Sequence, residues 1–145
     1  MIVLDATVLV YAVGGDHPLA SPCRRLVDAV GRGHVRATTT AEAIQEFAHV
    51  RARRRTRADA AQLGRAYVEL LSPLLPVSGD AVVRGLRLFE RHPALGAFDA
   101  VLAAAALEAG AEALVSADRA FGSVRGLPWV DPAGAGLDRL LGGPA

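Results

Sequence analysis

The first residues of the chain constrain its fold more than any other stretch. Ile2, Val3 and Leu4 form a short apolar run with two β-branched members, and Asp5 follows directly. Such a run is typical of a strand that is buried on both faces, as in a parallel sheet. Open α/β sheets bind ligands at the carboxyl ends of their strands, so Asp5 is a candidate site residue. A turn residue or a helix cap explains Asp5 equally well, and only the rest of the chain favours a site.

Length and composition predict one soluble domain. The chain has 145 residues, 52% of them hydrophobic, which is enough for an ordinary core. No apolar run approaches the roughly 20 residues of a membrane-spanning helix, and the N-terminus lacks the basic region of a signal peptide. The single cysteine, Cys23, excludes an internal disulfide. We therefore expect a cytoplasmic protein without a membrane partner.

Strand and helix patterns alternate along the chain, which predicts an α/β fold with a short, mainly parallel sheet flanked by helices. We expect one domain over residues 1–131, followed by a Gly/Pro-rich tail over 132–145 with a short helix at 137–141. The predicted strands cover residues 2–4, 34–38, 113–116 and 127–130, with a small edge strand at 74–77. The predicted helices cover residues 8–13, 21–31, 43–50, 57–71, 78–91 and 100–109.

Polar residues mark the expected helix starts. Thr39 with Glu42 three residues later forms a capping-box pattern. Ser21 before Pro22 also predicts a helix start, because proline is favoured at the first helical position. Thr56 is the expected cap of the next helix. In the helix that Ser78 opens, the periodicity predicts a buried face made of Val82, Val83, Leu86 and Phe89.

Four carboxylates stand out from the other acids. Asp5 and Asp118 follow apolar strands, Asp99 opens the most apolar helix, and Glu46 lies in the helix after the second strand. Since the carboxyl ends of parallel strands share one edge of a sheet, all four side chains could converge there. Two carboxylates about 4 Å apart repel by about 4 kcal/mol at an effective dielectric near 20. A hard divalent cation removes that repulsion, and oxygen ligands suit Mg²⁺ or Mn²⁺.

Each acid also has a simpler interpretation. Asp99 is explained as a helix cap, Asp118 as a turn residue and Glu46 as a solvated helix position. The basic residues are all arginine, and five of the 16 lie within Arg51–Arg57. This run is either a solvated helix end or a phosphate-contacting patch formed by Arg51, Arg53, Arg54, Arg55 and Arg57. An acidic metal site near arginines suits hydrolysis of phosphodiester bonds.

Four segments together resemble the PIN-domain family, in particular the toxin ribonucleases of VapBC toxin–antitoxin pairs. The resemblance covers nearly the whole domain in order and spacing, and no segment is specific alone. The segments are Ile2-Val3-Leu4-Asp5-Ala6-Thr7, Thr39-Thr40-Ala41-Glu42-Ala43-Ile44-Gln45-Glu46-Phe47, Phe98-Asp99-Ala100-Val101-Leu102-Ala103-Ala104-Ala105 and Leu114-Val115-Ser116-Ala117-Asp118-Arg119-Ala120-Phe121.

The resemblance implies a Mg²⁺- or Mn²⁺-dependent endoribonuclease that cleaves transfer or ribosomal RNA, with Asp5, Glu46, Asp99 and Asp118 as metal-binding catalytic residues. It also implies a homodimer and a VapB-like antitoxin, whose peptide crosses the groove and places an arginine against the acids. Ala6 and the Ser116-Ala117 pair depart from the commonest family residues. Thr7 and Ser116 still offer hydroxyls, which we expect to orient ligands or water.

Two other functions remain open at this point. One is a PIN-type nuclease that acts in RNA maturation or on DNA ends without an antitoxin. The other is an inactive PIN-like module that binds nucleic acid or protein. The presence of all four acids favours an enzyme over the binding module, because a polyanion binder gains nothing from clustered carboxylates.

Overall fold

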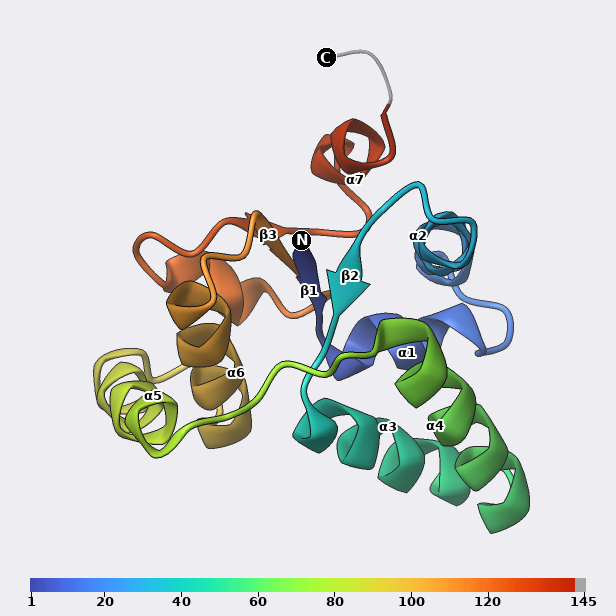
Figure 1. Ribbon diagram of the computed structural model, residues 1–145, viewed down its shortest axis with the longest axis horizontal. Helices are drawn as coiled ribbons and strands as arrows, with labels where there is room; N and C mark the ends of the chain where they lie inside the picture. The colour runs from blue at the N-terminus through green and yellow to red at the C-terminus, as the bar shows by residue number, and fades with distance from the viewer. Residues whose placement is uncertain (143–145) are drawn as a thin grey trace.

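A four-stranded parallel sheet lies at the centre of the chain, in a computed structural model that describes residues 1–142 (Figure 1). The strand order is β2-β1-β3-β4, and all three pairings are parallel. In the register, Ile2 of β1 lies opposite Ala37 of β2 and opposite Ala113 of β3. The strands are β1 (Ile2–Leu4), β2 (Ala37–Thr38), β3 (Ala113–Val115) and β4 (Trp129–Val130). The predicted α/β class and the mainly parallel sheet are confirmed.

Helices flank the sheet on both sides, and Figure 1 shows α1 to α4 on one side and α5 and α6 on the other. Two clusters of buried hydrophobic side chains fill the two sides. The helices are α1 (Ala6–Ala12), α2 (Ala20–Gly31), α3 (Ala41–Arg54), α4 (Arg57–Leu71), α5 (Gly79–Arg91), α6 (Ala97–Glu108), the 3₁₀ helix η1 (Arg119–Ser123) and α7 (Ala135–Leu140). No helix among the described residues is both long and apolar enough to cross a membrane.

The predicted edge strand at 74–77 is wrong. The segment is irregular, and the Leu75 N–H donates to the Thr39 carbonyl at 2.9 Å. Pro73 and Pro76 on either side of Leu75 have no N–H to donate, so the segment cannot continue a strand ladder.

The cap of α3 is one residue later than predicted. The Thr40 hydroxyl accepts a hydrogen bond from the Ala43 N–H at 3.2 Å, so Thr40, and not Thr39, is the N-cap. The Thr39 hydroxyl instead donates to the Leu4 carbonyl at 2.6 Å. Thr39 therefore ties the end of β2 to the end of β1, which fixes the start of α3 relative to Asp5.

The start of α2 also differs from the prediction. Leu19 is its N-cap without a side-chain hydrogen bond, and Ser21 and Pro22 lie within the first turn. Proline is tolerated there because the first N–H groups of a helix have no partner within the helix. The predicted caps Thr56 and Ser78 are confirmed, since each hydroxyl accepts a backbone N–H three residues later.

The predicted burial of the large side chains of α5 is wrong. Val83 is 51% exposed, and Val82, Leu86 and Phe89 are exposed as well. The helix packs on α6 through its small residues: a Cβ on Gly85 would lie 2.6 Å from the Cα of Val101. Only small side chains allow this close approach, and the helix then turns its large apolar face outward.

The predicted tail contains α7, which begins two residues before the expected helix. Leu137 of α7 is 1% exposed and joins the hydrophobic cluster on the α1 side of the sheet. Residues 143–145 of the tail lie outside the described residues. The division of the chain after residue 131 stays a prediction.

Candidate metal centre at the carboxyl edge of the sheet

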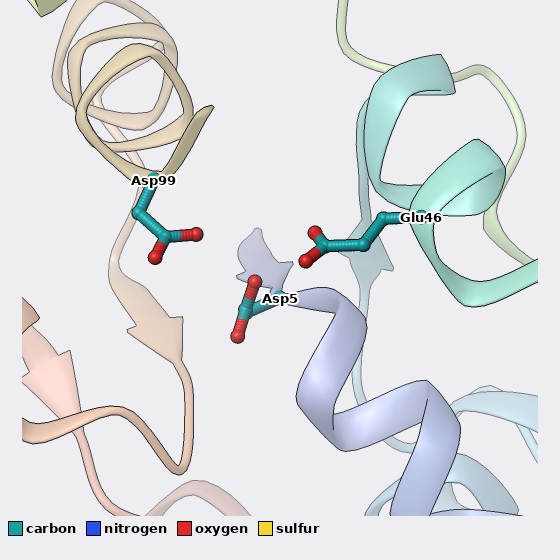
Figure 2. A group of neighbouring side chains, drawn as sticks. All are labelled: Asp5, Glu46 and Asp99. Carbon is teal, nitrogen blue, oxygen red and sulfur yellow. The ribbon is translucent and has the colours of Figure 1, made fainter. Parts of the chain in front are cut away.

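Three carboxylates from three separate segments meet at the carboxyl edge of the sheet. One oxygen from each of Asp5, Glu46 and Asp99 lies within 4.8 Å of the others. Figure 2 shows the three side chains pointing toward one another from the start of α1, from α3 and from the start of α6. Because β1 is an inner strand of the sheet, Asp5 lies between the two helices that carry the other acids.

Asp5 is held by two hydroxyl groups. Its side chain is buried, with the residue 2% exposed, and its Oδ2 accepts hydrogen bonds from Thr7 Oγ1 and Ser116 Oγ, each at 2.7 Å. Oδ2 also lies 3.4 Å from the Thr7 N–H, the position of a helix N-cap. No hydrogen bond reaches Oδ1 from residues 1–142, so this oxygen is available to a ligand.

A second set of contacts fixes the two hydroxyls. Thr7 Oγ1 accepts the Ala117 N–H at 3.1 Å, and Ser116 Oγ accepts the Asp118 N–H at 3.0 Å. The Trp129 indole donates to the Ser116 carbonyl at 3.0 Å. The hydroxyls of Thr7 and Ser116 are thus oriented to donate to Asp5, and their role in orienting a ligand or water stays a prediction.

Asp118 lies beside the three acids but does not join their cluster in the described residues. Its Oδ1 accepts the Ala120 N–H at 2.9 Å and caps η1, which matches the simpler interpretation of this residue. Its charge nevertheless acts on Asp99, as the pKa of that acid shows. Its role as a ligand stays a prediction.

The electrostatics of the cluster disfavour three ionised acids without a counter-charge. Burial, and then the charges of Asp5, Glu46 and Asp118, raise the pKa of Asp99 to about 7. Loss of hydration, and then the charge of Asp5, raise the pKa of Glu46 as well. Neither Asp99 nor Glu46 receives a hydrogen bond from any residue of the described chain, so nothing there offsets their charge.

These residues fit a divalent metal ion. All three donor groups are carboxylates, the hard oxygen ligands that Mg²⁺ and Mn²⁺ prefer. One of them, Asp5, is held in place by hydrogen bonds to its other oxygen, as is common for ligands in metal sites. A cation near Asp99 and Glu46 would favour their ionised forms and lower the pKa values that are raised here.

An apolar groove that the sequence pattern did not predict lies beside the acids. A groove of about 260 Å³ runs from Glu46 and Asp99 along Val82, Leu86 and Phe98. Phe98 is 80% exposed although it precedes a site residue in a buried helix. The groove could have been predicted from Ala81 and Gly85. These small residues lie one helical turn apart and mark the face of α5 that packs on α6, so the large apolar side chains face outward.

The arginine run is divided among different environments. Arg51, Arg53 and Arg54 lie in the last turn of α3, Arg55 is its C-cap, and Arg57 starts α4. Arg51 Nε contacts Asp59 Oδ2 at 2.6 Å, and this bond lowers the pKa of Asp59. The other four arginines are exposed and form no ion pair within residues 1–142.

Comparison with known proteins agrees with the fold. The PIN domain family model matches residues 2–127. The chain is 57% identical to Ribonuclease VapC7 of Mycobacterium tuberculosis over 98% of this chain and 99% of that protein. It is 39% identical to Ribonuclease VapC23 of the same species over 68% of this chain and 78% of that protein. The chain therefore belongs to the PIN-domain family and, within it, to the VapC ribonucleases.

Proposed function

We propose that this protein is a Mg²⁺- or Mn²⁺-dependent endoribonuclease and the toxin of a type II toxin–antitoxin system. The observation that carries the proposal is the meeting of three carboxylate oxygens within 4.8 Å in a chain of the VapC ribonucleases. The substrate is structured RNA, either transfer or ribosomal RNA, in the cytoplasm.

Each residue of the site has a distinct role in the proposed reaction. Asp5 and Asp99 are direct ligands, and Glu46 and Asp118 complete the site directly or through water. A divalent ion held there supplies a Lewis acid that lowers the pKa of water and offsets the charge on the phosphate. Thr7 and Ser116 fix Oδ2 of Asp5, which leaves Oδ1 for the ion. The one hydrogen bond to Asp118 Oδ1 leaves its Oδ2 for a water molecule.

The proposed partners are a VapB-like antitoxin and a second copy of this chain. The groove beside Glu46 and Asp99 supports the antitoxin, since an apolar peptide fits its walls and an arginine would pair with the acids. The outward face of α5 supports the homodimer, because Val83 and Phe89, which do not line that groove, are 51% and 45% exposed.

Cleavage of RNA tests the proposed activity. Purified protein is incubated with total cellular RNA in Mg²⁺, in Mn²⁺ and in EDTA, beside the Asp5→Asn variant. Asparagine keeps a cap oxygen for α1 but loses the charge, so the fold is retained. We expect discrete fragments that require both the metal and Asp5. Equal fragments in EDTA, or from Asp5→Asn, would contradict the proposal.

A pair of substitutions on α5 tests the homodimer. Val83→Ser with Phe89→Ser removes two exposed apolar side chains outside the groove and leaves the packing of Gly85 on α6 in place. We expect a dimer for the parent protein and a monomer with the same Tm for the double variant, measured by sedimentation velocity. A monomeric parent protein at micromolar concentration would exclude the dimer.

A further inference from the structure

A second cleft is lined by residues at the C-terminal ends of α1 and α3, whereas Asp5 and Glu46 lie at the start of α1 and in the first half of α3. Its volume is about 240 Å³, and no carboxylate lines it. We call it the arginine cleft; it is lined by Val10, Gly14, Gly15, Phe47, Arg51, Arg54 and Arg55. Three arginines line the cleft, and the charge of one of them, Arg51, is compensated by Asp59.

The three arginines of the cleft differ in their contacts. Arg51 is bound within the protein: its Nη1 donates to the Val13 carbonyl at 3.0 Å, and its Nε donates to Asp59 at 2.6 Å. These contacts join the ends of α1, α3 and α4 into one wall. Arg54 and Arg55 are exposed and form no hydrogen bond or ion pair through their side chains within residues 1–142. Their guanidinium groups are therefore available to an anion.

The glycine side of the cleft adds open space. A Cβ on Gly15 would meet no atom within 4 Å, so the protein does not fill the space beside it. Planar guanidinium groups beside this open space are suited to the oxygens of a phosphate group.

The distance from the acids suits a continuous strand. Glu46 and Arg54 lie on the same helix eight residues apart, which is about 12 Å along its axis. Stacked nucleotides advance about 3.4 Å each, so this distance covers roughly three to four of them. A strand of that length, with its cleaved bond at the acids, would reach the arginine cleft if it ran along α3.

We propose that Arg54 and Arg55 bind a backbone phosphate of the RNA substrate in the space beside Gly15, three to four nucleotides from the phosphate at the acid cluster. The proposal rests on the proposed ribonuclease function. In this proposal Arg54 and Arg55 contact the RNA, whereas Arg51 binds Val13 and Asp59 and holds the wall of the cleft in place.

RNA binding in EDTA tests the proposal without cleavage. The probe is a fluorescent single-stranded RNA pool of mixed sequence, and anisotropy is measured over a series of salt concentrations. The test variants are Arg54→Gln with Arg55→Gln, and Gly15→Asp, which places a carboxylate in the cleft. The matched control is Arg53→Gln with Arg57→Gln, which removes the same charge from the same run but touches none of the residues that line the cleft. The Tm of each variant verifies its fold.

We expect the double variant in the cleft and Gly15→Asp to bind about tenfold more weakly, and the control about threefold or less. The slope of log K against log salt falls by about 0.7 for each single-strand phosphate contact that is lost. Equal losses in the cleft and control variants would overturn the proposal, because they would show a general charge effect. An absence of RNA binding by the parent protein would overturn it as well.

Two further results distinguish the phosphate site from the proposed ribonuclease function and from a binding site for an acidic protein. If the parent protein cleaves no RNA in Mg²⁺ but the cleft variants still bind more weakly than the control in EDTA, the proposed function fails and the phosphate site stands. If polyglutamate binds with the same dependence on Arg54 and Arg55 and displaces RNA at lower concentration, the cleft is a site for an acidic protein and the proposal is overturned.

Discussion

The two halves of α3 carry opposite charges that are assembled in different ways. Its first half contributes Glu46 to acids that come from segments far apart in the chain. Its last turn belongs to a run of arginines that are adjacent in sequence but divided in space. Arg51 is bound to Asp59, whereas Arg54 and Arg55 face an open cleft.

This difference shows that neither the acids nor the arginines of α3 can be grouped by their distance along the sequence. The acids meet because parallel strands end at one edge and helices start there, so the topology gathers them. The arginines separate because α3 ends among them, and each residue then faces a different neighbour. The surroundings of each charged side chain are therefore set by the helix or strand that carries it.

The largest effect is expected at the acid end. Asp99→Asn removes a proposed metal ligand, and we expect RNA cleavage to fall by about 100-fold or more. The variant keeps the shape of the side chain and loses a charge that its neighbours repel. Single-turnover cleavage and the Tm are measured together. Full activity in Asp99→Asn would remove this acid from the site, and a collapse of the Tm would assign it a structural role.

A smaller effect on stability is expected for Arg51. Arg51→Gln loses the hydrogen bond to the Val13 carbonyl, which costs about 1 kcal/mol and lowers the Tm by about 3 °C in a domain of this size. The ion pair with Asp59 is partly buried, with the Arg51 side chain 15% and the Asp59 side chain 37% exposed, so its loss adds to this decrease. Arg53→Gln, on an exposed side chain of the same turn, is the control and leaves the Tm unchanged in differential scanning fluorimetry. Equal Tm values for the two variants would show that the contacts of Arg51 do not stabilise the fold more than the exposed side chain of Arg53 does.

An effect no larger than that of Arg51→Gln is a dependence of stability on pH without metal. The pKa of Asp99 rises from 3.8 to about 7 in the folded protein, so between these values the folded state binds more protons than the unfolded state. Stability from this group is present at low pH and is lost as the pH rises toward 7. Because Asp99 is partly open to solvent, we expect a decrease in Tm of only a few degrees from pH 5 to pH 7.5.

Two comparisons isolate that effect. Asp99→Asn removes the titrating group, and saturating Mn²⁺ offsets the charge of the ionised acid, so each reduces the slope of Tm against pH. A slope that is the same in Asp99→Asn and the parent protein would assign the dependence to other groups.

The sequence predicts the parts of the molecule that depend on local pattern and on strand order. The apolar run before Asp5 indicates a buried parallel strand, and the acid at its end then lies where such sheets bind ligands. The caps Thr56 and Ser78 are predicted because a single hydroxyl precedes each helix. At α3 two threonines are adjacent, and only the contact of Thr39 with the Leu4 carbonyl decides that Thr40 is the cap.

Other parts depend on contacts that the local pattern does not contain. The face of α5 was predicted from its largest side chains, but Ala81 and Gly85 decide the packing because they let the backbone of α6 approach. The bound state of Arg51 depends on a carbonyl at the end of α1 and an acid in α4. Neither contact follows from periodicity.

Binding of Mn²⁺ tests most directly the claim that the three acids form a metal site. Calorimetric titration near pH 7 in two buffers of different ionisation enthalpy measures both affinity and proton release. With the pKa of Asp99 at about 7, binding of the ion displaces about half a proton or more, and affinity rises from pH 6 to pH 8. We predict saturable binding with proton release in the parent protein, and much weaker binding without that release in Asp99→Asn. Equal binding by both proteins, or no saturable binding by the folded parent protein, would contradict the account.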